Sequence, residues 1–168
     1  DVYKRQTYSV APKVFSDLGA RVETIGSSPD GININQNCGS TSPNFLKEEI
    51  MKGSYDIGIA FDGDGDRILI INSDGKILDG DDILYILSKN ISPDTGVVGT
   101  LMTNKALELY FRKNDIPFLR AEVGDKYVLH KLIEKSWVLG GEPSGHVICL
   151  DCAPTVSYTH LTLPTNIG

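Results

Sequence analysis

Hydrophobic and polar positions alternate between helical and extended periods along the first part of the chain. Apolar side chains recur at helical spacing between residues 10 and 18, and Gly19 follows them as a stop signal. Residues 21–25 then predict a short strand. Residues 26–40 are rich in Gly, Asn, Ser and Pro, so they predict turns rather than a further regular element.

The pattern continues with a helix and a strand pair. Ser42 is placed to cap a helix whose first position is Pro43. Residues 55–61 read as a buried strand, and residues 68–71 as a second strand that ends in the turn sequence Asn-Ser-Asp-Gly. The first unit of the chain is predicted to end after this turn, at residue 77.

The second unit repeats the alternation of helices and strands. Helices are expected at residues 82–89, 103–113 and 126–135, and strands at residues 96–102, 116–123, 137–139 and 147–150. Regular alternation of this kind predicts an α/β fold. The two units, residues 1–77 and 78–153, show no sequence repeat, so any likeness between them would lie in the fold.

Composition and charge exclude two classes of partner. The net charge is −6 and no Lys/Arg cluster is present, whereas a nucleic-acid binder presents a basic face. No apolar run reaches the ~20 residues that span a bilayer, so no membrane partner is expected. Cys38, Cys149 and Cys152 are too few to complete a zinc site with a second ligand pair, and we interpret them as reduced thiols of a cytoplasmic protein.

Three carboxylates stand two residues apart directly after the strand at 55–61. Asp62, Asp64 and Asp66 alternate with glycines, which let the chain fold tightly around an ion. Three acids so close repel one another unless a cation lies between them, and hard oxygen ligands suit Mg²⁺. We therefore expect the three side chains to converge on one Mg²⁺, in a loop at the end of a parallel-type strand.

Two other readings of this loop are weaker. An EF-hand needs Gly at the sixth position and Glu at the twelfth, and Arg67 and Ser73 stand there. A plain Asp/Gly surface turn does not call for three alternating acids and an arginine between two buried strands.

A second polar set lies in the Gly-rich stretch 140–146. Glu142, Ser144 and His146 supply an acceptor, a hydroxyl and an imidazole, which can hydrogen-bond adjacent sugar hydroxyls. Taken alone, the stretch is more typical of a tight loop with an incidental histidine.

A third motif opens the helix at 126–135. Asp125 is placed to cap it, and Lys126 would add a positive charge to a helix N-terminus, which attracts anions. Taken alone, the motif favours an ordinary helix cap without a ligand.

Taken together, these motifs resemble the α-D-phosphohexomutases. The resemblance covers roughly residues 7–151 and is most specific in the loop at 62–67. It extends through the segments 31–35, 37–41, 99–102, 123–128 and 141–146.

The resemblance implies a fold and a domain order. The chain would hold two consecutive phosphohexomutase-type α/β domains with mixed sheets flanked by helices: the second domain at 1–77, and the third, truncated, at 78–153. The first and fourth domains would be missing from it. Residues 1–6 and 154–168 do not resemble the family and are interpreted as foreign, with the tail packing poorly.

The resemblance also implies roles for the polar residues. The family transfers phosphate between two positions of a sugar phosphate through a phosphoserine, which this chain would lack. Asp62, Asp64 and Asp66 would hold Mg²⁺ beside it, and Arg67 would be a catalytic residue at the same phosphate. The substrate would be bound by Glu142, Ser144, His146 and Lys126, with His146 also catalytic.

Two further function classes stay open from the sequence. The chain could be a non-catalytic module that binds Mg²⁺ or a sugar phosphate. It could also be a domain in which a metal has only a structural role, although Arg67 and the distant sugar loop favour the enzyme.

Overall fold

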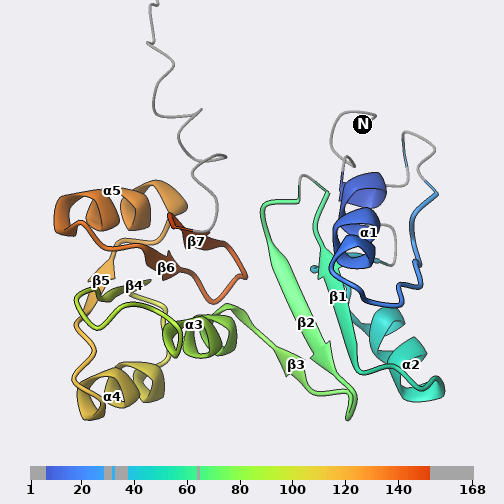
Figure 1. Ribbon diagram of the computed structural model, residues 1–168, viewed down its shortest axis with the longest axis horizontal. Coiled ribbons are helices and arrows are strands. Elements are labelled where there is room, and N and C mark those ends of the chain that lie inside the picture. Colours follow the sequence, from blue (N-terminus) through green and yellow to red (C-terminus); the bar gives the residue numbers. More distant parts are fainter. Residues whose placement is uncertain (1–6, 29–31, 33–37, 64, 152–168) are drawn as a thin grey trace, which may run out of the picture. The chain divides into compact units, whose positions relative to one another are not determined.

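The computed structural model describes residues 7–28, 32, 38–63 and 65–151. The chain divides into two compact units, Asp1–Asp79 and Gly80–Gly168 (Figure 1). The boundary expected from the sequence, after residue 77, lies two residues before this division. Predictions on residues 1–6, Asp64 and residues 154–168, including the loosely packed tail, fall outside the described residues.

Unit 1 combines two helices with a small sheet. Its elements are α1 (Thr7–Asp17), α2 (Asn44–Lys52), β1 (Ile57–Phe61), β2 (Ile68–Asn72) and β3 (Ile77–Leu78). The described strands pair in the order β1-β2-β3, and both pairings are antiparallel. Helix α2 packs on β1 and β2, where Ile50, Ala60 and Ile71 form the buried centre.

The expectation of a parallel-type strand before the acidic loop is wrong for the described pairing of β1. Phe61 pairs with Ile68, and residues 62–67 connect the two strands directly. A connection this short can only reverse the chain, because a parallel crossover needs about a dozen residues or more. The acidic loop is therefore the turn of a β-hairpin.

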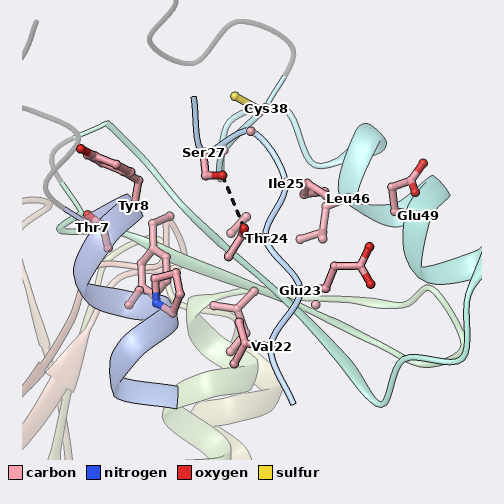
Figure 2. Close-up of a pocket in the computed structure, with 18 of the residues that line it drawn as sticks. Thr7, Tyr8, Val22, Glu23, Thr24, Ile25, Ser27, Cys38, Leu46 and Glu49 are labelled. Carbon is pink, nitrogen blue, oxygen red and sulfur yellow. Dashed lines mark hydrogen bonds between the residues drawn. The ribbon is translucent and has the colours of Figure 1, made fainter. Parts of the chain in front are cut away.

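Two local predictions in unit 1 are also wrong. Residues 21–25 form no strand, because a cavity separates them from β1 (Figure 2) and leaves no neighbouring main chain within bonding distance among the described residues. Helix α2 starts one residue later than expected, with Pro43 as its N-cap and no side-chain cap bond. In the preceding turn, the Ser42 N–H donates to the Gly39 carbonyl at 3.1 Å.

Unit 2 is built around a mixed sheet. Its elements are α3 (Gly80–Ser88), β4 (Val97–Thr100), α4 (Lys105–Lys113), β5 (Phe118–Ala121), α5 (Asp125–Lys135), β6 (Leu139–Gly141) and β7 (Val147–Cys149). The strand order is β5-β4-β6-β7, with β4 parallel to both neighbours and β7 antiparallel to β6. The α/β class and the mixed, helix-flanked sheet expected from the sequence are confirmed.

Helices cover both faces of this sheet (Figure 1). Neighbouring residues of β4 face opposite layers: Val97 joins a buried cluster with Leu107 and Phe111, and Val98 joins another with Val128 and Leu132. Side chains alternate across a strand, so a strand covered on both faces is apolar at every position. All four residues of β4 are buried, which makes it the centre of a three-layer unit.

The described helices are short. The longest, α1 and α5, have 11 residues, whereas a bilayer crossing takes about 20 apolar residues. Among the described helices, none has the length and apolar character of a membrane span.

Candidate functional site

The acidic loop is folded around the carboxylate of Asp62. Asp62 Oδ1 accepts hydrogen bonds from the main-chain N–H of Gly65 at 3.1 Å and of Arg67 at 3.2 Å. Gly65 has a φ of +74°, a conformation that glycine adopts without strain. The Asp62 side chain is only 10% exposed, so this carboxylate is fixed in place by the turn that it organises.

Arg67 lies beside the same carboxylate. Its Nε is 3.8 Å from Asp62 Oδ2, and its side chain is 48% exposed. Asp66 is exposed, and Asp64 is not among the described residues. The expected convergence of the three acids therefore stays a prediction. Within residues 7–28, 32, 38–63 and 65–151, no group of three His, Cys, Asp or Glu side chains is placed to hold a metal ion.

The donor chemistry of the loop fits Mg²⁺. Because Asp62 Oδ1 holds two amides, its Oδ2 is the oxygen that faces a charged partner, at present Arg67. A carboxylate held by main-chain hydrogen bonds is prearranged for a hard cation, which takes oxygen ligands. The other two acids would supply oxygens of the same kind.

The Gly-rich loop at 142–146 is joined to the start of α5. Glu142 Oε1 accepts a hydrogen bond of 2.7 Å from the main-chain N–H of Gly124, the N-cap of that helix. Gly124 has a φ of +128°, a region that other residues rarely adopt. Glycine at this position therefore lets the helix start turn its N–H toward the loop.

His146 makes a second connection to the same helix end. Its Nε2 lies 3.8 Å from Asp125 Oδ2, and its side chain is only 14% exposed, whereas the Asp125 side chain is 51% exposed. Glu142 N–H donates to the His146 carbonyl at 2.9 Å, which closes the loop. The imidazole is thus held in a nearly buried position beside an accessible carboxylate.

Ser144 and Lys126 differ from these two residues because both are exposed. Lys126 Nζ lies 4.8 Å from the centre of the Tyr127 ring. Of the four residues predicted to bind substrate, Glu142 and His146 are thus held by α5, and Ser144 and Lys126 are open to solvent.

Parallel strand direction explains why these segments meet. The chain leaves β4, β5 and β6 at the same edge of the sheet, since the three strands are parallel, and ligand sites of α/β sheets lie at this edge. The loop also rests on the start of α3, where Gly80 N–H donates to the Pro143 carbonyl at 3.1 Å. A Cβ at Gly80 would collide with the Glu142 carbonyl, so only glycine permits this contact.

Sequence reasoning missed two residues of this edge. The expectation that Asp125 caps the helix is wrong: Gly124 is the N-cap of α5, no side-chain cap bond forms there, and Asp125 is the first residue of the helix. The sequence separation of Asp125 from His146 carries no signal of their contact. Arg120 was not singled out at all. Its Nη1 donates to the carbonyls of Thr100, Leu101 and Thr103 at 2.9, 3.2 and 2.8 Å, which fixes the loop after β4.

Glu108 holds Arg120 in place and should give the second unit a measurable pH dependence. Its Oε2 accepts from Arg120 Nε at 3.0 Å and Nη2 at 2.9 Å. Hydrogen bonds from Lys105 and Arg120 lower the pKa of Glu108. A lowered folded-state pKa adds stability above the unfolded-state pKa, about 4.3 for Glu, and the gain is lost as the pH falls below it.

We expect Glu108→Gln to lower the urea midpoint of unit 2 above about pH 5.5, and we expect this difference to shrink as the pH falls through the lowered pKa of Glu108. Urea titrations at several pH values, followed by the fluorescence of Trp137, measure this difference. Glu122→Gln, which changes an exposed carboxylate at the end of β5, is the control. If the difference in urea midpoint between the two chains stays the same as the pH falls, the charge of Glu108 does not stabilise unit 2.

The second unit matches a known domain family. Residues 79–157 match the family model described as phosphoglucomutase/phosphomannomutase, alpha/beta/alpha domain III. The three layers of unit 2 agree with that description.

Most of the chain is similar in sequence to curated proteins. It is 53% identical over 153 residues to the phosphoglucosamine mutase of Pseudomonas entomophila. The match covers 89% of this chain and 34% of the relative. The chain therefore spans about a third of the length of the curated relative that it matches.

Solved structures share the fold. A phosphoglucomutase/phosphomannomutase family protein from Burkholderia thailandensis superimposes with a TM-score of 0.75 at 27% identity, over 88% of this chain and 34% of that one. The N-acetylphosphoglucosamine mutase of Aspergillus fumigatus, solved with GlcNAc-6P and magnesium, superimposes with a TM-score of 0.58 at 22% identity. This match covers 82% of this chain and 33% of that one. The latter likeness concerns the fold alone.

Proposed function

The chain matches the phosphohexomutases in sequence and fold, and we propose on this premise that it is part of a phosphoglucosamine mutase. That enzyme would interconvert glucosamine 6-phosphate and glucosamine 1-phosphate through a phosphoserine and a bisphosphate intermediate. The product would feed amino-sugar and cell-wall precursor synthesis in the cytoplasm. The identity of 53% over nine-tenths of the chain is the observation that carries this proposal.

The acidic loop would form the phosphoryl-transfer half of the site. Asp62, Asp64 and Asp66 would hold Mg²⁺, and Arg67 would contact the same phosphate. Mg²⁺ bound there supplies positive charge that stabilises the transferring phosphoryl group. The two amides bound to Asp62 Oδ1 support this role, because they keep the first carboxylate fixed whether or not a cation is bound.

The edge of unit 2 would bind the sugar. Glu142 and Ser144 would accept and donate hydrogen bonds to adjacent hydroxyls, and Lys126 would contact a phosphate at the N-terminus of α5. A lysine here lacks the bidentate geometry that an arginine would offer but keeps the charge. His146 would transfer a proton or contact phosphate, and its nearly buried position beside Asp125 supports an orienting role for that carboxylate.

Two alternatives have separate support. The family model names phosphoglucomutase and phosphomannomutase, so glucose or mannose phosphate is the alternative substrate for the same chemistry. A non-catalytic module that binds Mg²⁺ or a sugar phosphate is the alternative of a different class, because the chain spans only a third of its relatives.

A chimaeric enzyme tests the substrate. Residues 7–151 would replace the matching third of the Pseudomonas entomophila relative, and turnover would be measured with glucosamine, glucose and mannose 6-phosphates. We expect glucosamine 6-phosphate to give the highest kcat/KM, and the unmodified relative serves as the control. Preference for glucose or mannose phosphate would overturn the subfamily assignment.

Mg²⁺ binding to the acidic loop can be measured on this chain by itself. We expect weak binding, followed by the amide shifts of Gly63 and Gly65 during a Mg²⁺ titration. Asp64→Asn should weaken it by roughly tenfold or more, since one hard anionic ligand is lost. Asp74→Asn removes the same charge from the turn between β2 and β3 and is the matched control. Equal losses in both variants would mean that only the general charge of unit 1 attracts the cation.

A further inference from the structure

A carboxylate outside the acidic loop and outside the sugar loop (residues 142–146) is buried in unit 2. Asp81, in the first turn of α3, is only 7% exposed. Moving a carboxylate from water into a protein interior costs free energy, which hydrogen bonds have to offset. The proposed function gives this residue no role.

Asp81 joins the starts of two helices. Its Oδ2 accepts a hydrogen bond of 2.7 Å from the main-chain N–H of Asn104, the N-cap of α4. Both helices lie on the same face of the sheet, where Leu84 of α3 and Phe111 of α4 belong to one buried cluster (Figure 1). Hydrogen bonds from amides to an ionised carboxylate are stronger than those between neutral groups. The start of α3 is therefore fixed to the start of α4.

The Asn104 end of this bond is itself held in place. Asn104 follows the loop after β4, in which Thr100 N–H donates to Thr103 Oγ1 at 2.9 Å and Thr103 N–H donates to the Thr100 carbonyl at 3.1 Å. Arg120 binds three carbonyls of the same loop. A hydrogen bond to Asn104 thus ties α3 to a fixed part of the sheet edge.

The residue before Asp81 carries the sugar loop. Gly80 N–H donates to the Pro143 carbonyl at 3.1 Å. A Cβ at Gly80 would collide with the Glu142 carbonyl and would also meet the Gly145 nitrogen. The helix start and the loop therefore touch with no space for a side chain between them. Because Gly80 and Asp81 share a peptide bond, a shift of Asp81 also moves the residue that supports the loop.

This support reaches the polar side chains of the loop. Glu142 Oε1 accepts from Gly124 N–H at 2.7 Å, and Glu142 N–H donates to the His146 carbonyl at 2.9 Å. Helix α5, which begins after Gly124, packs on the opposite face of the sheet from α3. The loop is thus held from both faces, by the start of α3 and by the start of α5.

We propose that Asp81 is a positioning residue of the sugar site. It holds the start of α3 against the sugar loop and so keeps Glu142 and His146 where one sugar can reach both, without touching the substrate itself. The inference rests on the proposed function, because it takes the loop to bind the sugar of a sugar phosphate.

A purely structural role for Asp81 is the competing explanation. An acid in the first turn of a helix is stabilised by the helix dipole. Asp82 lies in the same turn and is less buried, so it can supply that charge at a smaller cost of desolvation. The bond from Asp81 to a second helix start is what the dipole alone does not require.

The first measurement is amide hydrogen exchange in the 168-residue chain. Gly80 and Gly124 report the two contacts of the sugar loop. Val97, whose N–H donates to the Pro117 carbonyl in the buried sheet, reports the global stability of unit 2. We expect Asp81→Ala to speed exchange at Gly80 and Gly124 at least ~10-fold relative to Val97, because the start of α3 is released. Asp81→Asn keeps an oxygen acceptor for Asn104 and should restore most of the protection.

Ser88→Ala is the matched control. Ser88 is 3% exposed and lies at the other end of α3, where its Oγ donates to the Tyr85 carbonyl at 2.8 Å. Its loss should change exchange at all three amides by one common factor. The same common factor in Asp81→Ala would mean that Asp81 only stabilises the unit, and it overturns the proposal. If Asp81→Ala does not fold, Asp81→Ser takes its place, since a serine side chain is too short to reach Asn104.

The second measurement is turnover of glucosamine 6-phosphate by the chimaera. Asp81→Ala should lower kcat/KM by roughly 10–100-fold, as expected when a binding group is displaced. Asp81→Asn should recover most of this loss, and Ser88→Ala should show none of it. Equal kcat/KM values for Asp81→Ala and Ser88→Ala overturn the positioning role.

Glu142→Ala in the chimaera separates this inference from the proposed function. A loss of kcat/KM with Glu142→Ala but not with Asp81→Ala overturns the inference alone. No loss with Glu142→Ala overturns the sugar-binding role of the loop, and the inference with it.

Discussion

The 168-residue chain on its own is expected to give no detectable turnover of glucosamine 6-phosphate, at least ~10³-fold below the chimaera. The resemblance places the phosphoryl carrier, a serine, in a domain outside this sequence. Ser144 belongs to the sugar loop and is exposed, so it is a poor substitute. Without the carrier, the acidic loop would supply only the proposed metal half of the transfer site, where close carboxylates repel one another.

Positioning is the second reason for the expected loss. Phosphoryl transfer depends largely on holding the phosphate and the attacking oxygen in line. The substrate phosphate that does not react would be anchored by a further domain of the family, so the isolated chain could not orient the sugar.

A coupled assay with glucosamine 6-phosphate, Mg²⁺ and the bisphosphate activator measures this directly. The chimaera is the positive control, and an Asp64→Ala variant of the isolated chain is the negative one. Turnover above the blank that Asp64→Ala abolishes would show that the 168 residues form a complete enzyme, contrary to the proposal.

Phe111→Ala is expected to destabilise unit 2 by about 3–5 kcal/mol, the usual cost of removing a buried phenylalanine side chain. Phe111 is fully buried and packs with Leu84, Val97 and Leu139. Its ring centre lies 5.2 Å from that of Phe118. The substitution therefore leaves a cavity where α3, α4 and the sheet meet. Since domains are stable by about 5–15 kcal/mol, this loss would leave unit 2 partly unfolded near 37 °C.

Urea unfolding followed by Trp137 fluorescence gives the change in free energy. Leu109→Ala, on the same helix but 50% exposed, is the matched control and should cost less than about 1 kcal/mol. Phe111→Leu keeps most of the volume and should lie between the two. Equal effects of Phe111→Ala and Leu109→Ala would mean that α4 does not pack on the sheet as described.

Local chemistry in the sequence was enough to predict most of the second unit. Residues 96–102 predicted a strand, and the structure has β4 within this range, with helices on both faces. Asn104, at the start of the helix expected from residue 103, caps α4: its side chain accepts from Ala106 N–H at 2.9 Å. Such signals depend on a few neighbouring residues, so a single sequence contains them.

Strand pairing was the part of the prediction that failed. Residues 21–25 have the composition of a strand, but a strand also needs a partner within hydrogen-bonding distance, and a cavity lies there instead. The antiparallel pairing of β1 depended on β2 and on the short loop between them. Propensity alone cannot decide either point, because it does not specify which segments become neighbours.

For the candidate site, the sequence by itself determined the chemical inventory: three acids with Arg67, and a Gly-rich loop with Glu142 and His146. Only the tertiary structure decided that Glu142 binds Gly124 and that His146 lies beside Asp125. The physical reason is the parallel sheet, whose strands deliver loops distant in sequence to one edge. A motif consists of residues that are close in the sequence, whereas the contacts that orient its side chains depend on how the strands pair in the sheet.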